Sequence, residues 1–143
     1  MGIYLNPGNE EFYNAVRNSK IYVDKTELIK FTNSVLCSEQ RNVCVSRPRR
    51  FGKSMAANML LAYYSKGCKL AIASEEGYKS NLNKYNVIHL NMIDFLSRTD
   101  SINELIEYLK KKVLRELKKE YPDIDCFDWN DLVDVLETIH YEK

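Results

Sequence analysis

The strongest constraint on this chain is a basic segment of nine residues, Ser46-Arg47-Pro48-Arg49-Arg50-Phe51-Gly52-Lys53-Ser54. Its last three residues match the end of the pattern G-x-x-x-x-G-K-[ST], which lies between a strand and a helix. The apolar run Val43-Cys44-Val45 predicts the strand, and the segment from Lys53 to about Ser65 predicts the helix. A helix N-terminus presents unpaired backbone N–H groups and a partial positive charge to an anion. The segment therefore predicts a phosphate-binding loop.

Each residue at the end of this loop has an expected role. Gly52 lets the backbone approach a phosphate closely, and Lys53 is the expected catalytic cation because it can reach the β- and γ-phosphates. The Ser54 hydroxyl is the expected ligand of Mg²⁺. Arg49 and Arg50 add two permanent positive charges to the same loop. The predicted nucleotide-contacting set is Arg49, Arg50, Phe51, Gly52, Lys53 and Ser54.

The first glycine of the pattern is replaced in this chain. Its position falls on Arg47, which adopts a positive φ at greater cost than glycine, and Pro48 contributes no N–H group. The donors nearest a phosphate would come from Arg50 through Ser54, and none of those is lost. The alternative interpretation is a basic turn that happens to end in Gly-Lys-Ser. The strand expected before the loop and the helix expected after it favour the phosphate-binding interpretation.

Several further helices are predicted from their start signals. A turn at Asn6-Pro7-Gly8-Asn9 opens one helix, and Asp24 with Glu27 has capping-box spacing at the start of another. The pair Asp24-Lys25 is accordingly interpreted as a helix start and not as a catalytic pair. Ser101 and Glu104 form a complete capping box, and a last helix is expected to begin near Asp128.

A second core strand is predicted at residues 86–92, because this segment is mostly apolar and suits a strand buried on both faces. Asp94 follows it and is a candidate for a metal-binding acid. An acid with that role sits directly at the end of its strand, and the better-placed position holds Asn91, which carries no charge.

The composition of the chain limits the classes of partner that it is expected to bind. Lys and Arg number 21 and Asp and Glu number 20, so the net charge of +1 gives no overall attraction to nucleic acid. The basic residues of the helix expected after Ser101 are interpreted as a solvated face. The four cysteines lack the spacing of a zinc site, and no apolar run reaches membrane-spanning length. These features predict a cytoplasmic protein with no membrane partner.

At this point two runs of residues carry a resemblance to a known family. They are Tyr22-Val23-Asp24-Lys25-Thr26-Glu27-Leu28-Ile29 and the loop Arg47-Pro48-Arg49-Arg50-Phe51-Gly52-Lys53-Ser54, with Asn83-Lys84-Tyr85-Asn86-Val87-Ile88 as a third, weaker one. Together they resemble the bacterial AAA-ATPase-like family, whose loop has arginine at the position of Arg47. The resemblance runs from about Asn6 to the end of the chain and is weakest between Cys68 and Gly77, where the family has a longer segment.

The resemblance implies the fold class and the domain organisation. Members have a three-layer α/β P-loop NTPase (AAA-like) domain with a parallel sheet, and many carry a C-terminal nuclease-like domain of the PD-(D/E)XK type. Residues 1–143 would then be the N-terminal part of the P-loop domain, with the acidic Walker B strand and later elements beyond Lys143. The predicted strands at 43–45 and 86–92 would not be neighbours in such a sheet.

The function predicted from these residues is ATP binding through the loop, with Mg²⁺, as part of a larger ATPase. Hydrolysis is not predicted, because a hydrolytic water needs an orienting acid and no convincing one is present. The first alternative is a non-hydrolysing module whose arginine-rich loop binds nucleic acid or another anion. The second is a small-molecule kinase, for which an acceptor pocket is not visible in the sequence.

Overall fold

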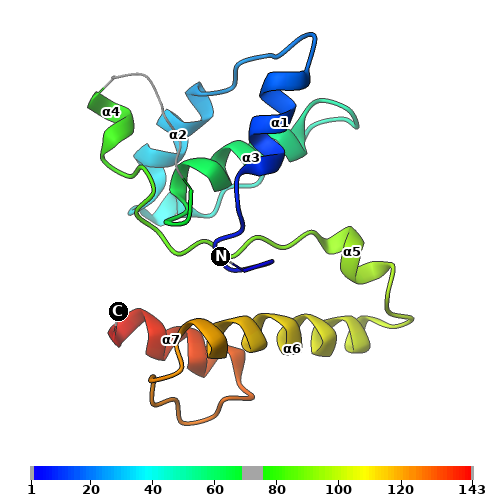
Figure 1. Ribbon diagram of the computed structural model, residues 1–143, viewed down its shortest axis with the longest axis vertical. Helices are drawn as coiled ribbons and strands as arrows, with labels where there is room; N and C mark the ends of the chain where they lie inside the picture. Colours follow the sequence, from blue (N-terminus) through cyan, green and yellow to red (C-terminus); the bar gives the residue numbers. More distant parts are fainter. Residues whose placement is uncertain (1, 69–75, 143) are drawn as a thin grey trace. The chain divides into compact units, whose positions relative to one another are not determined.

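The computed structural model describes residues 2–68 and 76–142. The regular structure within these ranges is helical (Figure 1). The elements are α1 (Glu10–Asn18), α2 (Glu27–Val35), the short 3-10 helix η1 (Glu39–Arg41), α3 (Lys53–Tyr64), α4 (Glu76–Lys79), α5 (Met92–Leu96), α6 (Ile102–Glu120) and α7 (Leu132–Glu142). The segment in which the family resemblance is weakest includes residues 69–75, which lie outside the described residues.

The chain divides into two compact units. Unit 1 comprises Asn6–Val87 and contains α1 to α4, and unit 2 comprises Gly2–Leu5 with Ile88–Lys143 and contains α5 to α7. Each unit has its own cluster of buried apolar side chains. Since the predicted phosphate-binding loop lies between η1 and α3, the candidate site belongs to unit 1.

Helix α3 is the centre of unit 1. It packs against α1 and α2, which Figure 1 shows close to it in blue and in light blue to cyan. Buried apolar side chains occur around much of its surface, as expected of a helix with neighbours on several sides. The core of unit 1 consists of Phe12, Ile29, Met59, Ala62, Tyr63 and Tyr78. The helix that starts at the loop is therefore anchored by the best-buried part of the unit.

Unit 2 is built around the long helix α6. Apolar residues recur along one of its faces at helical spacing and pack with α7 and with Leu5 near the N-terminus. The buried members are Leu5, Val113, Leu117, Ile124, Cys126, Val135 and Ile139. The Glu116 carboxylate accepts hydrogen bonds from the backbone N–H groups of Ile3 (2.8 Å), Tyr4 (2.8 Å) and Leu5 (2.9 Å), which fixes the N-terminal segment to this helix.

The predicted α/β fold with a parallel sheet is wrong for this structure. Within the described residues the β-interactions are isolated bridges, Leu5 with Ile88 and Ser65 with Tyr85, and no sheet forms. The segment at 43–45 is extended but unpaired, and Val43 and Val45 are 42% and 48% exposed. A strand exists only through hydrogen bonds to a neighbour, and no described segment supplies one to these residues.

The second predicted strand, at 86–92, is also wrong, and its C-terminal end shows why. The Asn91 side chain accepts a hydrogen bond from the Ile93 N–H group, so Asn91 is the N-cap of α5 and Met92 is its first residue. Asparagine favours this position because its side-chain oxygen satisfies a donor of the first helical turn. Apolar composition alone did not distinguish this helix start from the end of a strand.

The helix starts were predicted more accurately. The Ser101 hydroxyl accepts from the Glu104 N–H group at 3.2 Å, which confirms the capping interaction that opens α6. The capping interaction predicted between Asp24 and Glu27 was wrong. The Asp24 carboxylate instead accepts hydrogen bonds from the N–H and hydroxyl groups of Thr26, and α2 begins at Glu27. No helix of the described residues is long and apolar enough to cross a membrane.

Candidate functional site

The loop that precedes α3 has two residues in the left-handed backbone region. Arg50 has φ of 67° and Gly52 has φ of 74°, and Gly52 is the N-cap of α3. Glycine adopts this conformation without a steric penalty, whereas a residue with a Cβ does so at a cost. No side chain caps the first turn of α3. The N–H groups of that turn have no acceptor within the helix and are available to an anion.

Arg47, at the position of the missing first glycine, has an ordinary backbone. Among the described residues other than glycine, φ is positive at Asn6, Arg50 and Asn83, and Arg47 is not one of them. A glycine is therefore not required where the common pattern has one. The Arg47 carbonyl instead accepts a hydrogen bond of 2.5 Å from the Lys53 ammonium, which closes the loop on itself.

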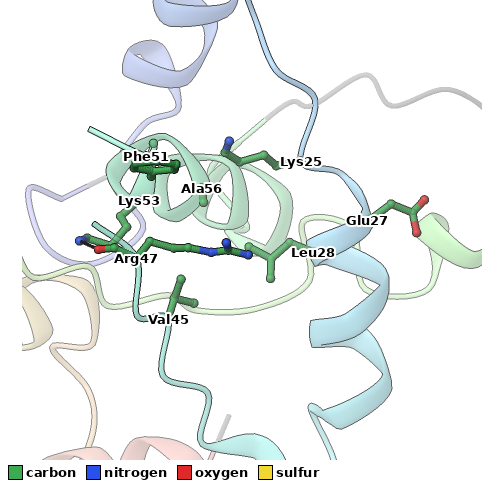
Figure 2. Close-up of a pocket in the computed structure, with 9 residues that line it drawn as sticks. Lys25, Glu27, Leu28, Val45, Arg47, Phe51, Lys53 and Ala56 are labelled. Carbon is green, nitrogen blue, oxygen red and sulfur yellow. Dashed lines mark hydrogen bonds between the residues drawn. The ribbon is translucent and has the colours of Figure 1, made fainter. Parts of the chain in front are cut away.

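A cavity of about 470 Å³ lies beside this loop. Figure 2 shows the side chains around it, with the Arg47 side chain extending toward Leu28 and Lys25 approaching from the start of α2. The volume is that of an ordinary small-molecule pocket, which is at least a few hundred Å³. The residues around it are Lys25, Glu27, Leu28, Val45, Arg47, Phe51, Gly52, Lys53 and Ala56.

The structure brings together part of the predicted set. Phe51, Gly52 and Lys53 line the cavity, and Lys53 is the first residue of α3. Arg49, Arg50 and Ser54 are exposed on the same loop and first turn but are not among the cavity residues. Ser54 follows Lys53 in the first helical turn, so its hydroxyl is accessible to solvent at the start of α3.

Sequence reasoning missed Lys25 at this site. A Cβ placed on Gly52 would lie 3.2 Å from Lys25 Cε and 3.3 Å from Lys25 Nζ, so the lysine covers the glycine that is the N-cap of α3. The two residues are 27 positions apart in the sequence. A signal was available, because Lys25 lies within the first run that carries the family resemblance, but the adjacent helix start explained its presence equally well.

The charge around the cavity is predominantly positive. Lys25, Arg47 and Lys53 contribute three cations, and Glu27 contributes one carboxylate. That carboxylate forms a 2.8 Å ion pair with Lys30, and Figure 2 shows it pointing away from the other labelled side chains. The α3 N-terminus adds its own partial positive charge. An anion is the ligand that this environment favours.

Asp94 and the four cysteines, which were considered from the sequence as metal-binding residues, are not part of this site. Asp94 lies in the first turn of α5, in unit 2, where an acidic residue favours a helix start. The described residues contain no group of three or more His, Cys, Asp or Glu side chains placed to hold a metal ion. The four cysteines form no disulfide, and burial raises the pKa of the Cys68 and Cys126 thiols.

Comparison with known proteins identifies a family. A family model described as a predicted AAA-ATPase, AAA-ATPase-like, matches residues 7–141. No curated protein and no solved structure matches the chain. The family match contains α1 to α6, the loop and all of the cavity residues. Because it spans nearly the whole sequence, we conclude that the chain belongs to the AAA-ATPase-like family of predicted AAA-ATPases.

Proposed function

We propose that this chain binds ATP at the cavity beside the loop, with the phosphates at the start of α3. The observation that carries the proposal is the left-handed Gly52 at an uncapped helix N-terminus, next to the Lys53 ammonium. Family membership supports a nucleotide as the anion. A helix start of this kind binds phosphate through backbone N–H groups that already point toward the binding position when no ligand is bound.

The residues at the loop fit the group that they would hold. Lys53 has three donors, and its bond to the Arg47 carbonyl uses one of them. The other two remain for a phosphate oxygen, so a phosphate would not have to replace the bond to Arg47. The Ser54 hydroxyl is the ligand that this chain would offer to Mg²⁺, and the ion would supply charge neutralisation at the phosphates. Arg49 and Arg50 would add long-range attraction from the loop surface.

The proposal covers binding and does not extend to hydrolysis. Glu27 is the carboxylate at the cavity among the described residues, and it pairs with Lys30 instead of pointing inward. Hydrolysis needs a group that positions water at the γ-phosphate. The larger ATPase, a joined nuclease-like domain and a bacterial source belong to the proposal only through the family resemblance, and a cytoplasmic location belongs to it only through the composition of the chain.

Thermal unfolding with and without Mg-ATP tests the proposal. At about a hundred times its dissociation constant, Mg-ATP should stabilise the protein by ~2.7 kcal/mol. Lys53→Ala should remove most of the shift because the phosphates lose their nearest mobile cation, and Ser54→Ala should remove the part that depends on Mg²⁺. Lys66→Ala is the matched control, since Lys66 is exposed and follows the opposite end of α3.

Two results would contradict nucleotide binding at this loop. One is an unchanged melting temperature with Mg-ATP. The other is a shift that survives Lys53→Ala while Arg47→Gly abolishes it, because the loop would then not act through its helix start. Salt-sensitive binding of single-stranded DNA without any nucleotide effect would favour the anion-binding alternative.

A further inference from the structure

Lys25 is a cation of the candidate site that comes from a separate helix. It precedes α2, whereas Lys53 and Gly52 lie at the start of α3. The last methylene group and the ammonium group of its side chain lie over Gly52. A Cβ built on residue 52 would lie 3.2 Å from Lys25 Cε and 3.3 Å from Lys25 Nζ. The side chain is half-buried and also lines the cavity. Its ammonium thus lies where the loop backbone turns into the helix.

The local sequence fixes this position. The Asp24 carboxylate accepts hydrogen bonds from the Thr26 N–H group (2.9 Å) and hydroxyl (3.0 Å), which forms a tight turn around Lys25. The Lys25 carbonyl accepts from the Leu28 N–H group at 2.9 Å, so its backbone is also held by the first turn of α2. The Asp24 carboxylate is therefore bonded to Thr26 and forms no ion pair with Lys25.

The charges around Lys25 point to an anionic ligand. In residues 2–68 and 76–142 no carboxylate forms an ion pair with it, and its neighbours at the cavity include Arg47 and Lys53. The helix start under it also carries partial positive charge. Like charges held together cost free energy, and a polyanion such as a triphosphate would offset this cost.

We propose that Lys25 is a second phosphate-binding lysine of this site, which contacts the triphosphate chain from the side opposite Lys53. The inference rests on the proposed nucleotide function and adds to it a residue outside the loop motif. It also gives Gly52 a second role. Besides its left-handed φ, the glycine leaves the space in which the Lys25 side chain crosses the helix start.

Calorimetric titration with Mg-ATP tests the role of Lys25. Lys25→Gln should raise the dissociation constant about tenfold, which corresponds to about 1.4 kcal/mol. Lys25→Arg keeps the charge and should stay within about threefold of the unchanged protein. Lys66→Gln removes one charge at the far end of α3, about 18 Å away along the helix, and should have no more than a twofold effect.

Sodium tripolyphosphate, used as a competitor of Mg-ATP, shows which part of the ligand Lys25 contacts. Its inhibition constant should rise by the same factor in Lys25→Gln, because it has the phosphate chain without the nucleoside. An unchanged constant for tripolyphosphate with weaker ATP binding would overturn the assignment to phosphate. Lys25→Met retains the aliphatic stem over Gly52 and should give the same result, which keeps the test valid if the glutamine variant does not fold.

The outcomes separate the two proposals. If the unchanged protein binds Mg-ATP and Lys53→Ala loses it, while Lys25→Gln behaves like Lys66→Gln, then Lys25 has no phosphate contact and nucleotide binding stands. If the unchanged protein binds neither Mg-ATP nor tripolyphosphate, the nucleotide function itself is refuted, and the role of Lys25 with it.

Discussion

Replacing Glu116 by glutamine should weaken unit 2 by about 2 kcal/mol. One oxygen of the carboxylate accepts from the Ile3 N–H group and the other accepts from those of Tyr4 and Leu5. Glutamine retains one acceptor oxygen, so it can keep the Tyr4 and Leu5 bonds in a weaker, neutral form. The Ile3 bond is lost. Hydrogen bonds to a charged group contribute ~1.5–3 kcal/mol and neutral ones ~1 kcal/mol, and the exposed Ile3 group regains water.

Urea unfolding followed by tryptophan fluorescence measures this loss in the correct unit. Trp129 is the sole tryptophan of the chain, and it packs against the core of unit 2. Glu107→Gln is the matched control, because Glu107 lies on the same helix in an exposed pair with Lys110 and should change stability by less than ~0.5 kcal/mol. A Glu116→Gln effect no larger than that of the control would refute the reasoning.

The pH dependence gives a second check on Glu116. Burial raises the pKa of this carboxyl group, but the three backbone hydrogen bonds outweigh burial and hold the pKa below its ordinary value of 4.5. A lowered pKa in the folded state means that the stabilisation is complete above pH 4.5 and disappears as the pH falls through the folded value. The difference between the two proteins should therefore be constant near neutral pH and shrink in acid.

Three further changes test other parts of the structure. Arg50→Gly should raise the free energy of unfolding of unit 1 by ~1 kcal/mol, because glycine adopts the φ of 67° without the steric cost that arginine has. Amide hydrogen exchange in α3 should then be slower. Tyr63→Phe should lower the same free energy by ~1–3 kcal/mol and make this exchange faster, because the buried hydroxyl donates to the Tyr78 carbonyl at 2.7 Å and accepts from Asn33 at 2.9 Å. An unchanged exchange rate would contradict either prediction. Changing Lys110, Lys111 and Lys112 together to glutamine should leave the Mg-ATP dissociation constant within about twofold, and a large loss of DNA binding would instead reveal a nucleic-acid surface on α6.

Local chemistry accounts for what could be predicted from the sequence. The capping box of Ser101 and the loop ending in Gly-Lys-Ser each act over a few residues, so their helices, α6 and α3, begin where expected. The expected strands depended on partners that are distant in sequence. An apolar run such as 86–92 is compatible with a strand, a loop or a helix start, and only pairing decides between them.

In the candidate site, too, residues of one local motif could be predicted from the sequence, and a residue distant in sequence could not. Phe51, Gly52 and Lys53 were predicted from a contiguous motif, and all three line the cavity. Lys25 reaches it only because α2 packs against α3, which spacing along the chain does not reveal. Whether the predicted residues contact a nucleotide stays a prediction, and the titrations with Lys53 and Lys25 variants address it.

Unit 2 combines two segments that are distant in sequence, and this affects the order of folding during synthesis. Unit 1 is a continuous stretch that can fold once Val87 has left the ribosome. Residues 2–5 are made before unit 1, but their partner Glu116 follows Leu5 by 111 positions. At ~5–20 residues per second, the N-terminal segment waits roughly 6–22 s for α6. During that interval Leu5 lacks the side chains of α6 and α7 that bury it, so a nascent-chain chaperone that shields this leucine would act on residues 2–5 until α6 has been made.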